Sequence, residues 1–175
     1  MKAFNVVNLM QWIEENEEHL KPPVCNKEIF PGSDYIVMVV GGPNTRKDYH
    51  YNETPEFFYQ IKGSMVLKII NNGEPKDIPI NEGEIFVLPA KVPHSPQRTA
   101  GSIGIVIEHV RDVEQHTDGF QWYCDACNHK LHEDYFKLTD IEKQLPEVFS
   151  KFNNNEELHQ CKNCGDVLQV KPATA

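Results

Sequence analysis

Between residues 35 and 109 the sequence repeats one pattern, in which a short apolar run is followed by a turn rich in glycine and asparagine. The apolar runs cover residues 35–40, 57–61, 65–70, 85–88 and 103–109. The turns between them include Gly41-Gly42-Pro43, Lys62-Gly63, Asn71-Asn72-Gly73 and Asn81-Glu82-Gly83. Short strands at roughly ten-residue spacing with such turns are typical of a β-sandwich or a closed barrel. This region is therefore predicted to form an all-β domain.

Helical signals flank the predicted strands. Residues 8–20 read as a short helix, with Asn8 as its N-cap and Gln11 at the capping-box position, and the Lys21-Pro-Pro run ends it. A second helical stretch begins near Thr139, and we expect Pro146 to interrupt or kink it. The predicted organisation is a barrel with an N-terminal helix over residues 1–112 and a small C-terminal appendage over residues 113–175, packed on the barrel.

Composition and charge exclude several classes of protein. The 175 residues include 39% apolar side chains, enough to bury a core, and the formal net charge is −9. A surface this acidic repels phosphate backbones, which argues against nucleic-acid binding. The longest apolar runs fall far short of the roughly 20 residues that a membrane-spanning helix needs. The N-terminus turns acidic where a signal peptide would be apolar, so we expect a cytoplasmic protein with no membrane partner.

Four of the five cysteines form two C-x-x-C pairs, Cys124 with Cys127 and Cys161 with Cys164. Such turns can place four thiolates tetrahedrally around one ion, and Gly165 suits a turn that needs an unusual backbone conformation. A sulfur-only tetrahedral site accepts zinc or a rubredoxin-like iron. Because four thiolates leave no open position for a substrate, the predicted role of this site is structural. The surrounding residues 119–175 are acidic, which disfavours a nucleic-acid-binding zinc ribbon.

A second set of metal-binding side chains falls within the predicted barrel. His50 and Glu56 lie around one strand–turn boundary, and His94 follows the turn that ends at Pro93. Two imidazoles and one carboxylate from neighbouring strands can occupy one face of an octahedral ion, which leaves three positions for substrate and oxygen. This is the arrangement of the non-haem Fe(II) oxygenases. The spacing of His50, Glu56 and His94 alone does not distinguish a metal site from ordinary surface or core histidines, which remain the alternative.

Two segments around these side chains resemble the paired motifs of the cupin superfamily. Residues 42–63 resemble the first motif, with Asp48 in place of its first histidine. Residues 83–98 resemble the second motif, with Lys91 where cupins usually have glycine and Arg98 where they usually have asparagine. Most cupins bind metal through three histidines and one glutamate, so these departures distinguish the chain from most cupins, and longer runs of sequence resemble one family in particular.

That family is the 3-hydroxyanthranilate 3,4-dioxygenases of the compact bacterial and fungal type. The runs that resemble it are LKPPV, VVGGPNTRKDYH, EFFYQ, HSPQR and WYCDAC, and the resemblance covers nearly the whole chain. It implies a cupin fold, a double-stranded β-helix or jelly-roll barrel, with a rubredoxin-like C-terminal appendage. It also implies cleavage of 3-hydroxyanthranilate with O2 to 2-amino-3-carboxymuconate 6-semialdehyde. This product cyclises to quinolinate, a precursor of NAD in the kynurenine pathway of tryptophan breakdown.

The resemblance also implies a role for each matching residue. Catalytic Fe(II) would be held by His50, Glu56 and His94. Arg98 would bind the substrate's carboxylate with help from Arg46, and Glu108 would lie near the substrate's amine and hydroxyl as a proton acceptor. The site residues implied for the second ion, iron or zinc, are Cys124, Cys127, Cys161 and Cys164. By analogy with other barrels of this kind, we expect a homodimer.

Three other functions remain open from the sequence. A different cupin dioxygenase could use the same three ligands, although the pair of Arg98 and Glu108 favours an aminophenol that carries a carboxylate. A non-enzymatic cupin that binds a small molecule would keep its function without iron. An electron-transfer protein built around the four cysteines would show a reversible redox signal at that site.

Overall fold

The structure is a computed structural model that describes residues 6–22, 25–44, 46–139 and 141–170. In this part of the chain, no helix is long and apolar enough to cross a membrane. In chain order the elements are α1 (Leu9–Glu15), the 3-10 helix η1 (Glu17–Leu20), β1 (Asn26–Glu28), β2 (Tyr35–Gly41), β3 (Asp48–Asn52), β4 (Glu56–Lys62), β5 (Met65–Asn71), β6 (Glu74–Ile80), β7 (Ile85–Leu88), β8 (His94–Arg98), β9 (Ile103–His109), β10 (Asp118–Tyr123), β11 (Lys130–Phe136), α2 (Ile141–Asn153) and the 3-10 helix η2 (Glu156–Leu158).

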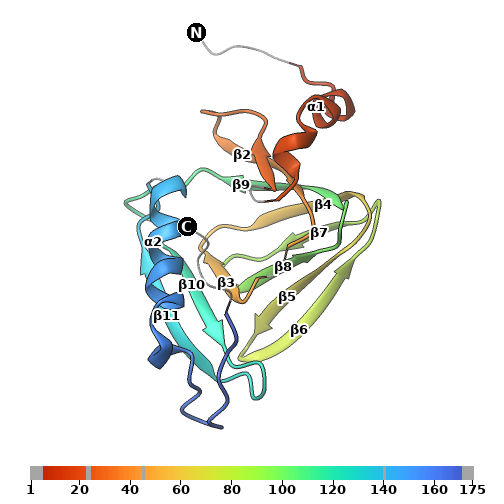
Figure 1. The fold of residues 1–175 in the computed structure, drawn as a ribbon. Helices are drawn as coiled ribbons and strands as arrows, with labels where there is room; N and C mark the ends of the chain where they lie inside the picture. Colours follow the sequence, from red (N-terminus) through yellow and green to blue (C-terminus); the bar gives the residue numbers. More distant parts are fainter. Residues whose placement is uncertain (1–5, 23–24, 45, 140, 171–175) are drawn as a thin grey trace.

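The strands form two antiparallel sheets that face each other (Figure 1). The five-stranded sheet has the order β1-β2-β9-β4-β7, and the six-stranded sheet has the order β11-β10-β3-β8-β5-β6. Several neighbouring strands are far apart in the sequence, as β2 and β9 show, so the fold depends on long-range pairing. The expectation of an all-β, two-sheet fold with a short N-terminal helix is confirmed.

The main hydrophobic core lies between the sheets. Its buried side chains come from both sheets, and the largest of them, Phe58, projects from β4. Close packing of such side chains removes apolar surface from water, at about 25 cal/mol for each Å² buried. The buried members of this core are Phe58, Met65, Leu67, Ile69, Ile80, Leu88 and Val106.

The N-terminal helix is shorter than the predicted residues 8–20. Asn8 caps α1 as expected, since its side chain accepts a hydrogen bond from the Gln11 N–H, but the Gln11 side chain bonds Glu15 instead of returning to the cap. Asn16 ends the helix because its side-chain amide donates to the Trp12 carbonyl at 2.7 Å, and the chain continues as η1. Both pieces pack on the outer face of the five-stranded sheet, where Ile13, Leu20, Val39 and Ile105 form a second core.

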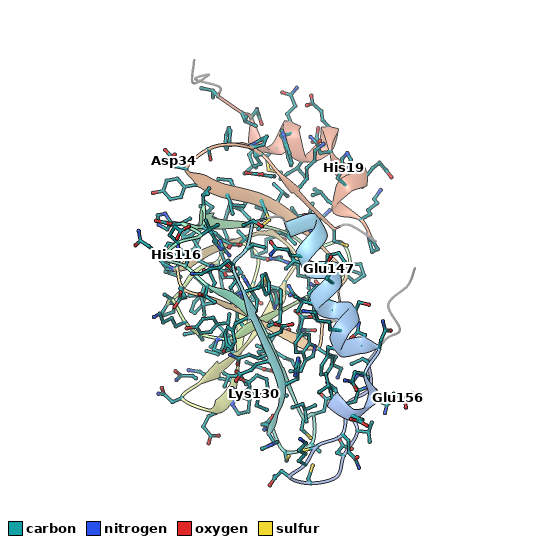
Figure 2. The ribbon with its side chains drawn as sticks, turned by 90° about the vertical axis from the view of Figure 1, so that its left-hand side faces the viewer. His19, Asp34, His116, Lys130, Glu147 and Glu156 are labelled. Carbon is teal, nitrogen blue, oxygen red and sulfur yellow. The ribbon has the colours of Figure 1, made fainter. Side chains whose placement is uncertain are left out.

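The C-terminal part of the chain continues the six-stranded sheet. β10 pairs with β3 along five residues, and β11 pairs with β10. Pro146 lies inside α2 and does not interrupt it, because the helix is held by Val148 and Phe152, which pack on Phe120 and Trp122 of β10. Because β10 belongs to a sheet shared with the barrel, the division of the chain at residue 112 stays a prediction. His19 in η1 and Lys130 at the start of β11 lie near opposite ends of the molecule (Figure 2).

Candidate active site

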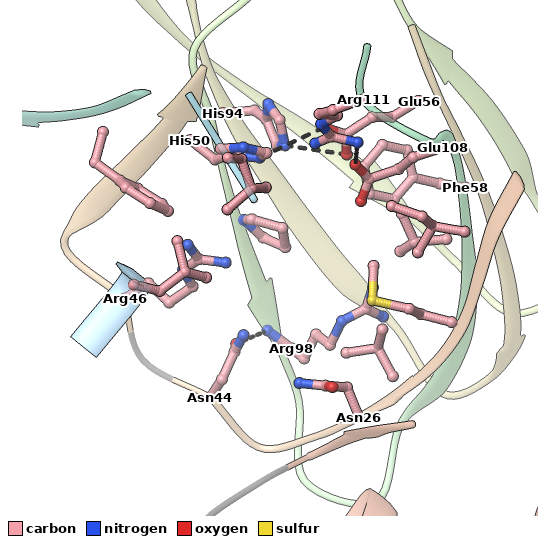
Figure 3. Close-up of a pocket in the computed structure, with 18 residues that line it drawn as sticks. Asn26, Asn44, Arg46, His50, Glu56, Phe58, His94, Arg98, Glu108 and Arg111 are labelled. Carbon is pink, nitrogen blue, oxygen red and sulfur yellow. Dashed lines mark hydrogen bonds and ion pairs between the residues drawn. The ribbon is translucent and has the colours of Figure 1, made fainter. Parts of the chain in front are cut away.

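A cavity of about 220 Å³ lies between the two sheets (Figure 3). This volume is below the roughly 300–1,000 Å³ typical of sites for drug-sized ligands, so it suits a molecule with a single ring. Apolar side chains form much of its wall, and polar side chains gather at its two ends. The residues that line it are Asn26, Ile36, Met38, Val40, Asn44, Arg46, His50, Glu56, Phe58, His94, Pro96, Arg98, Val106, Glu108, Arg111, Phe120, Leu138 and Leu145.

One end of the cavity carries the three side chains that the sequence singles out as metal ligands. His50 in β3 and His94 in β8 are directly opposite each other in the six-stranded sheet, and Glu56 reaches them from the start of β4 in the other sheet. The donor atoms of all three lie within 4.8 Å of one another. Two imidazoles and one carboxylate at this separation form a donor set that fits one divalent ion and leaves part of its coordination sphere open toward the cavity.

Hydrogen bonds set the orientation of both imidazoles. The Nδ1 of His94 lies 3.1 Å from the Val92 carbonyl, which can only accept, so Nδ1 carries the proton and Nε2 faces Glu56 at 3.2 Å. The Nε2 of His50 lies 3.0 Å from Asp118 Oδ1, so its Nδ1 faces Glu56 at 3.5 Å. In each ring one nitrogen is fixed by the protein and the other is directed at the shared site, which is the usual support for a metal-binding histidine.

The charges of these groups are strongly coupled. Burial disfavours the charged form of His50, but hydrogen bonds to Asp118 and Glu56 outweigh burial and raise its pKa to about 9. Burial likewise favours the neutral form of Glu56, but the charge of His94 and hydrogen bonds from both imidazoles hold its pKa well below the ordinary value. A metal ion would take the place of the protons that now share this site.

Asn52 links the ligand Glu56 to a second carboxylate, Glu108. The Nδ2 of Asn52 donates to Glu56 Oε1 at 3.2 Å and to Glu108 Oε2 at 3.3 Å. Oδ1 of Asn52 accepts hydrogen bonds from the N–H and the hydroxyl of Thr54. The amide nitrogen Nδ2 is therefore the atom that faces the two carboxylates and donates to them. The two carboxylates are neighbours across β4 and β9.

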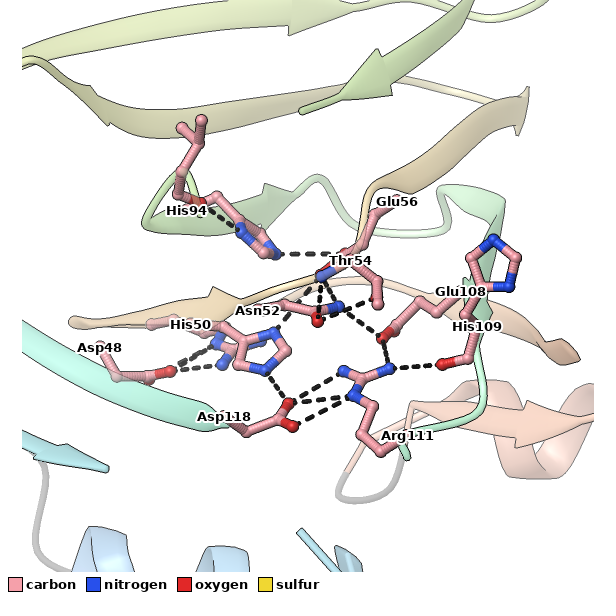
Figure 4. Close-up of polar contacts among 12 residues, drawn as sticks. Asp48, His50, Asn52, Thr54, Glu56, His94, Glu108, His109, Arg111 and Asp118 are labelled. Carbon is pink, nitrogen blue, oxygen red and sulfur yellow. Dashed lines mark hydrogen bonds and ion pairs between the residues drawn. The ribbon is translucent and has the colours of Figure 1, made fainter. Parts of the chain in front are cut away.

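Arg111 and Asp118 complete the network around Glu108 (Figure 4). Nη1 of Arg111 lies 2.6 Å from Glu108 Oε2, and its Nη2 lies 2.9 Å from Asp118 Oδ1. Burial and the charge of Glu56 raise the pKa of Glu108, while Arg111 acts in the opposite direction. Asp118 also holds His50, so a continuous set of polar contacts runs from the metal ligand to Glu108.

The other end of the cavity is positively charged. Arg98 is 4% exposed, its backbone N–H donates to Asn44 Oδ1 at 2.7 Å, and its Nη1 donates to Gln60 Oε1 at 3.3 Å. Its buried Nε has no hydrogen-bond partner, and within the described ranges the guanidinium makes no ion pair. Burial lowers the pKa of Arg98 to about 10, and the charge of Arg46 acts in the same direction. A buried cation without an acidic partner is costly unless an anion joins it.

Arg46 differs from Arg98 because it has an acidic partner. Its guanidinium forms an ion pair with Asp48, including a hydrogen bond of 3.1 Å from Nε to Oδ2. Gln97 holds the Arg46 backbone, since its side-chain amide bonds the Arg46 N–H and carbonyl. Asp48 therefore positions Arg46 and offsets its charge.

The four cysteines form a second cluster with metal-ligand geometry. Their sulfur atoms all lie within 4.8 Å of one another, with 3.6 Å between Cys124 and Cys164 and 3.5 Å between Cys127 and Cys161. A tetrahedral ion with 2.3 Å bonds to sulfur requires sulfur–sulfur separations of about 3.8 Å. The predicted clustering of the two pairs is confirmed, and the four sulfur donors fit one metal ion that prefers thiolate ligands.

Matching backbone turns hold the two cysteine pairs. The N–H of Asn128 donates to the Cys124 carbonyl and the N–H of Gly165 donates to the Cys161 carbonyl, each at 2.9 Å. Asn128 has φ +58° and Gly165 has φ +82°, the left-handed conformation that we expected at Gly165. A hydrogen bond from Asn163 is the largest contribution that lowers the pKa of Cys127 to about 6, which favours the thiolate that a metal needs.

The structure brings together every barrel residue that the sequence singled out, with the three ligands and Glu108 near one end of the cavity and both arginines along the rest of its wall (Figure 3). Sequence reasoning missed Asn52, Arg111 and Asp118. A signal for Asp118 was present in the run DGFQWY, which alternates like a strand that would pair within the barrel.

Comparisons with known proteins identify the family of the chain. The profile of the family described as 3-hydroxyanthranilic acid dioxygenase matches residues 1–153. A protein of Xanthomonas oryzae pv. oryzae (strain MAFF 311018) named 3-hydroxyanthranilate 3,4-dioxygenase is 56% identical over 159 residues, which cover 91% of this chain and 89% of that protein. A protein of the same name from Bacillus cereus (strain ATCC 10987 / NRS 248) is 47% identical over 168 residues, which cover 95% of this chain and 93% of that protein.

Similarity to solved structures is weaker. A cupin-2 domain containing protein from Shewanella frigidimarina superposes with a TM-score of 0.47 and 20% identity, covering 61% of this chain and 95% of that chain.

Proposed function

The chain belongs to the 3-hydroxyanthranilic acid dioxygenase family, and on this premise we propose that it opens the aromatic ring of 3-hydroxyanthranilate with O2. The bond between C3 and C4 of the ring breaks, and both oxygen atoms enter the product, 2-amino-3-carboxymuconate 6-semialdehyde. This product closes to quinolinate without an enzyme, which places the reaction on the route to NAD.

One observation carries this proposal: the cavity joins a His–Glu–His donor set at one end to a buried arginine that has no acidic partner among the described residues at the other. A molecule that fits both ends needs a chelating pair of atoms and an anionic group on the same small ring, with the anionic group placed to reach the arginine while the pair binds the metal. The 2-amino and 3-hydroxyl groups of 3-hydroxyanthranilate form such a pair, and its carboxylate supplies the charge.

We propose Fe(II) as the ion held by His50, Glu56 and His94. Bound there, Fe(II) would supply open coordination positions and a path for electrons between the ring and O2. The protein's own contribution is to present three donors on one face, because Asp118 and the Val92 carbonyl fix the rings of the two histidines.

The remaining polar residues bind the substrate and handle its proton. Arg98 holds the carboxylate through a planar guanidinium, which can make two parallel hydrogen bonds to it, and Arg46 adds positive charge to the same wall. Glu108 lies beside the metal-binding end and accepts a proton from the 3-hydroxyl group. Its pKa, raised by burial and by Glu56, makes it a better base than an exposed carboxylate. The apolar walls formed by Phe58 and Val106 exclude water from the ring.

At the second cluster we propose one iron or zinc ion bound by Cys124, Cys127, Cys161 and Cys164, with a structural role. The four sulfur atoms fill a tetrahedral coordination sphere, which leaves no position for a substrate. The ion would join the loop after β10 to the loop after η2, two loops that are far apart in the sequence.

We also propose that the protein works as a homodimer in the cytoplasm. Four clustered thiols and an Fe(II) site both suit a reducing compartment. Light scattering on the metal-loaded protein tests the oligomeric state, and a monomeric mass would overturn it.

The experiment that tests the proposed function is an anaerobic reconstitution with Fe(II), followed by addition of 3-hydroxyanthranilate and air-saturated buffer. We expect a new near-ultraviolet absorbance from the ring-opened semialdehyde, and quinolinate as the final product by mass spectrometry. The same protein with His94→Ala serves as the control and should give neither. If the wild-type protein holds iron at the triad and leaves 3-hydroxyanthranilate unchanged, the proposed substrate is wrong, and other aminophenols and catechols should then be assayed.

A further inference from the structure

The guanidinium of Arg98 donates a hydrogen bond to a neutral side chain, that of Gln60. Its Nη1 donates to Oε1 of Gln60 at 3.3 Å, and both residues are almost wholly buried, Arg98 at 4% and Gln60 at 1% exposed. A buried arginine is usually paired with a carboxylate. Gln60 occupies the place where such a carboxylate would lie.

Gln60 is itself firmly held. Its Nε2 donates to the Lys62 carbonyl at 2.9 Å, which turns its carbonyl oxygen toward Arg98. The backbone of Gln60 accepts from the Gly83 N–H at 2.8 Å and donates to the Glu84 carbonyl at 3.0 Å. The acceptor offered to Arg98 is therefore fixed in place before any ligand arrives.

Gly104 provides the space for this pair. It lies opposite Gln60 in the register of β4 and β9. A Cβ atom at this position would lie 2.8 Å from Arg98 Nη1 and 2.9 Å from Gln60 Oε1, closer than real Cβ contacts allow. Any side chain at residue 104 would push the guanidinium or the amide away. The absence of a side chain at Gly104 therefore leaves room for the contact between Arg98 and Gln60.

We propose that Gln60 is a positioning residue that aims Arg98 at the carboxylate of the substrate while leaving its positive charge uncompensated. This inference rests on the proposed function, since it assigns Arg98 to the substrate's anionic group. An amide oxygen accepts one hydrogen bond without bringing a charge. A glutamate at the same position would form an ion pair with Arg98, and the substrate would then have to compete with it.

The chemistry predicts that Gln60 affects ligands only through their carboxylate. 3-Hydroxyanthranilate and 2-aminophenol share the amine and hydroxyl groups, but 2-aminophenol lacks the carboxylate. A residue that acts through Arg98 should therefore change the affinity for the first ligand and leave the affinity for the second almost unchanged. A residue that only supports the fold would change both equally.

The test measures the dissociation constants of both ligands for iron-loaded protein without oxygen, by isothermal titration calorimetry. The variants are Gln60→Glu and Gln60→Leu, and the matched control is Gln121→Leu, which removes a buried glutamine from β10 outside the cavity. We expect Gln60→Glu to weaken 3-hydroxyanthranilate binding roughly tenfold or more, and Gln60→Leu several-fold. Binding of 2-aminophenol should stay within about twofold of the wild-type value in every variant.

Different outcomes separate this inference from the proposed function. If the wild-type protein binds both ligands equally, the assignment of Arg98 to a carboxylate is wrong, and the inference falls with it. If the wild-type protein prefers 3-hydroxyanthranilate and Gln60→Glu keeps that preference, the inference alone is overturned. Equal weakening of both ligands would also overturn it. Should Gln60→Glu not fold, the ratio of the two dissociation constants in Gln60→Leu decides the matter in the same way.

Discussion

Glu108 and Arg111 form a buried ion pair, with 2.6 Å between Oε2 and Nη1 and side chains that are less than a tenth exposed. Glu108 alone would be forced toward its protonated form, because it is buried and faces the charge of Glu56. Arg111 opposes both effects, and Asp118 fixes Arg111 from the other side. The pair keeps a carboxylate available as a base beside the metal-binding end of the cavity.

We expect Arg111→Met to shift the pH dependence of catalysis. Without Arg111 the pKa of Glu108 rises further, so its basic form exists only at higher pH, and the acidic limb of the kcat/KM profile moves upward. At neutral pH, kcat/KM should fall about tenfold or more, which is within the usual contribution of a general base. Steady-state rates between pH 5 and 9 measure both effects. An acidic limb that stays in place would show that Glu108 does not act as the base.

Arg98→Ala should raise KM for 3-hydroxyanthranilate while iron stays bound. Hydrogen bonds to a charged partner contribute about 1.5–3 kcal/mol, so KM should rise roughly ten- to hundredfold. The control is Lys47→Ala, which removes a solvent-exposed positive charge that pairs with Asp125. Metal analysis and steady-state kinetics on both variants check the prediction, and a KM near the wild-type value in Arg98→Ala would refute the assigned role.

Metal uptake at the triad should weaken as the pH falls. Without a metal the pKa of His50 is raised to about 9, so at neutral pH a proton occupies the group that the metal needs. Each metal ion must displace this proton, and its affinity should therefore fall about tenfold per pH unit below pH 9. Competition with a chelator between pH 6 and 9 measures the affinity. The same measurement on His94→Ala protein gives the metal bound by the four cysteines alone, which is then subtracted. An affinity independent of pH would contradict the pairing of His50 with Asp118 and Glu56.

Protonation of His50 weakens metal binding but stabilises the metal-free protein. A raised pKa means that His50 stabilises the metal-free protein fully below its unfolded pKa of about 6.5, and that this contribution disappears as the pH rises through 9. Metal-free protein should therefore lose stability toward pH 9 while its metal affinity increases.

Gly165→Ala should destabilise the cysteine cluster. At φ +82° an alanine is strained, and the cost is about 1 kcal/mol or slightly more. Asn128→Gly is the matched control, because Asn128 holds the equivalent turn at φ +58° and glycine fits there without strain. Urea denaturation of the metal-loaded protein measures both, and equal stability of Gly165→Ala and wild type would contradict the role of this turn.

The sequence predicted five of the strands but missed β3 and β8, which carry the two histidines of the site. β2, β4, β5, β7 and β9 all match predicted apolar runs. β3 and β8 carry His50, His94 and Arg98 on their inward face, so the usual alternation of apolar and polar side chains is absent where the cavity lies. A pattern based on hydrophobic burial cannot detect a strand whose buried side chains are polar.

Some of the functional residues could be proposed from the sequence, and others could not. The short spacing of the cysteine pairs predicted their cluster, because both sulfurs of a C-x-x-C turn are close in any fold. His50, Glu56 and His94 could be proposed because their side-chain types match one kind of metal site. Arg111 lies three residues after Glu108 in the sequence, whereas Asp118 reaches His50 only through the pairing of β10 with β3. The role of Asp118 depends on this long-range register, which the alternating run DGFQWY does not specify.

The most direct test of the central claim is the stoichiometry of oxygen consumption, measured with an oxygen electrode during turnover of 3-hydroxyanthranilate by the Fe(II)-loaded protein. A ring-cleaving dioxygenase that works at His50, Glu56 and His94 should consume O2 and 3-hydroxyanthranilate in equal amounts and release no hydrogen peroxide. The same measurement on His94→Ala should show background uptake only. Uptake that persists in His94→Ala, or hydrogen peroxide in place of ring-opened product, would contradict the account.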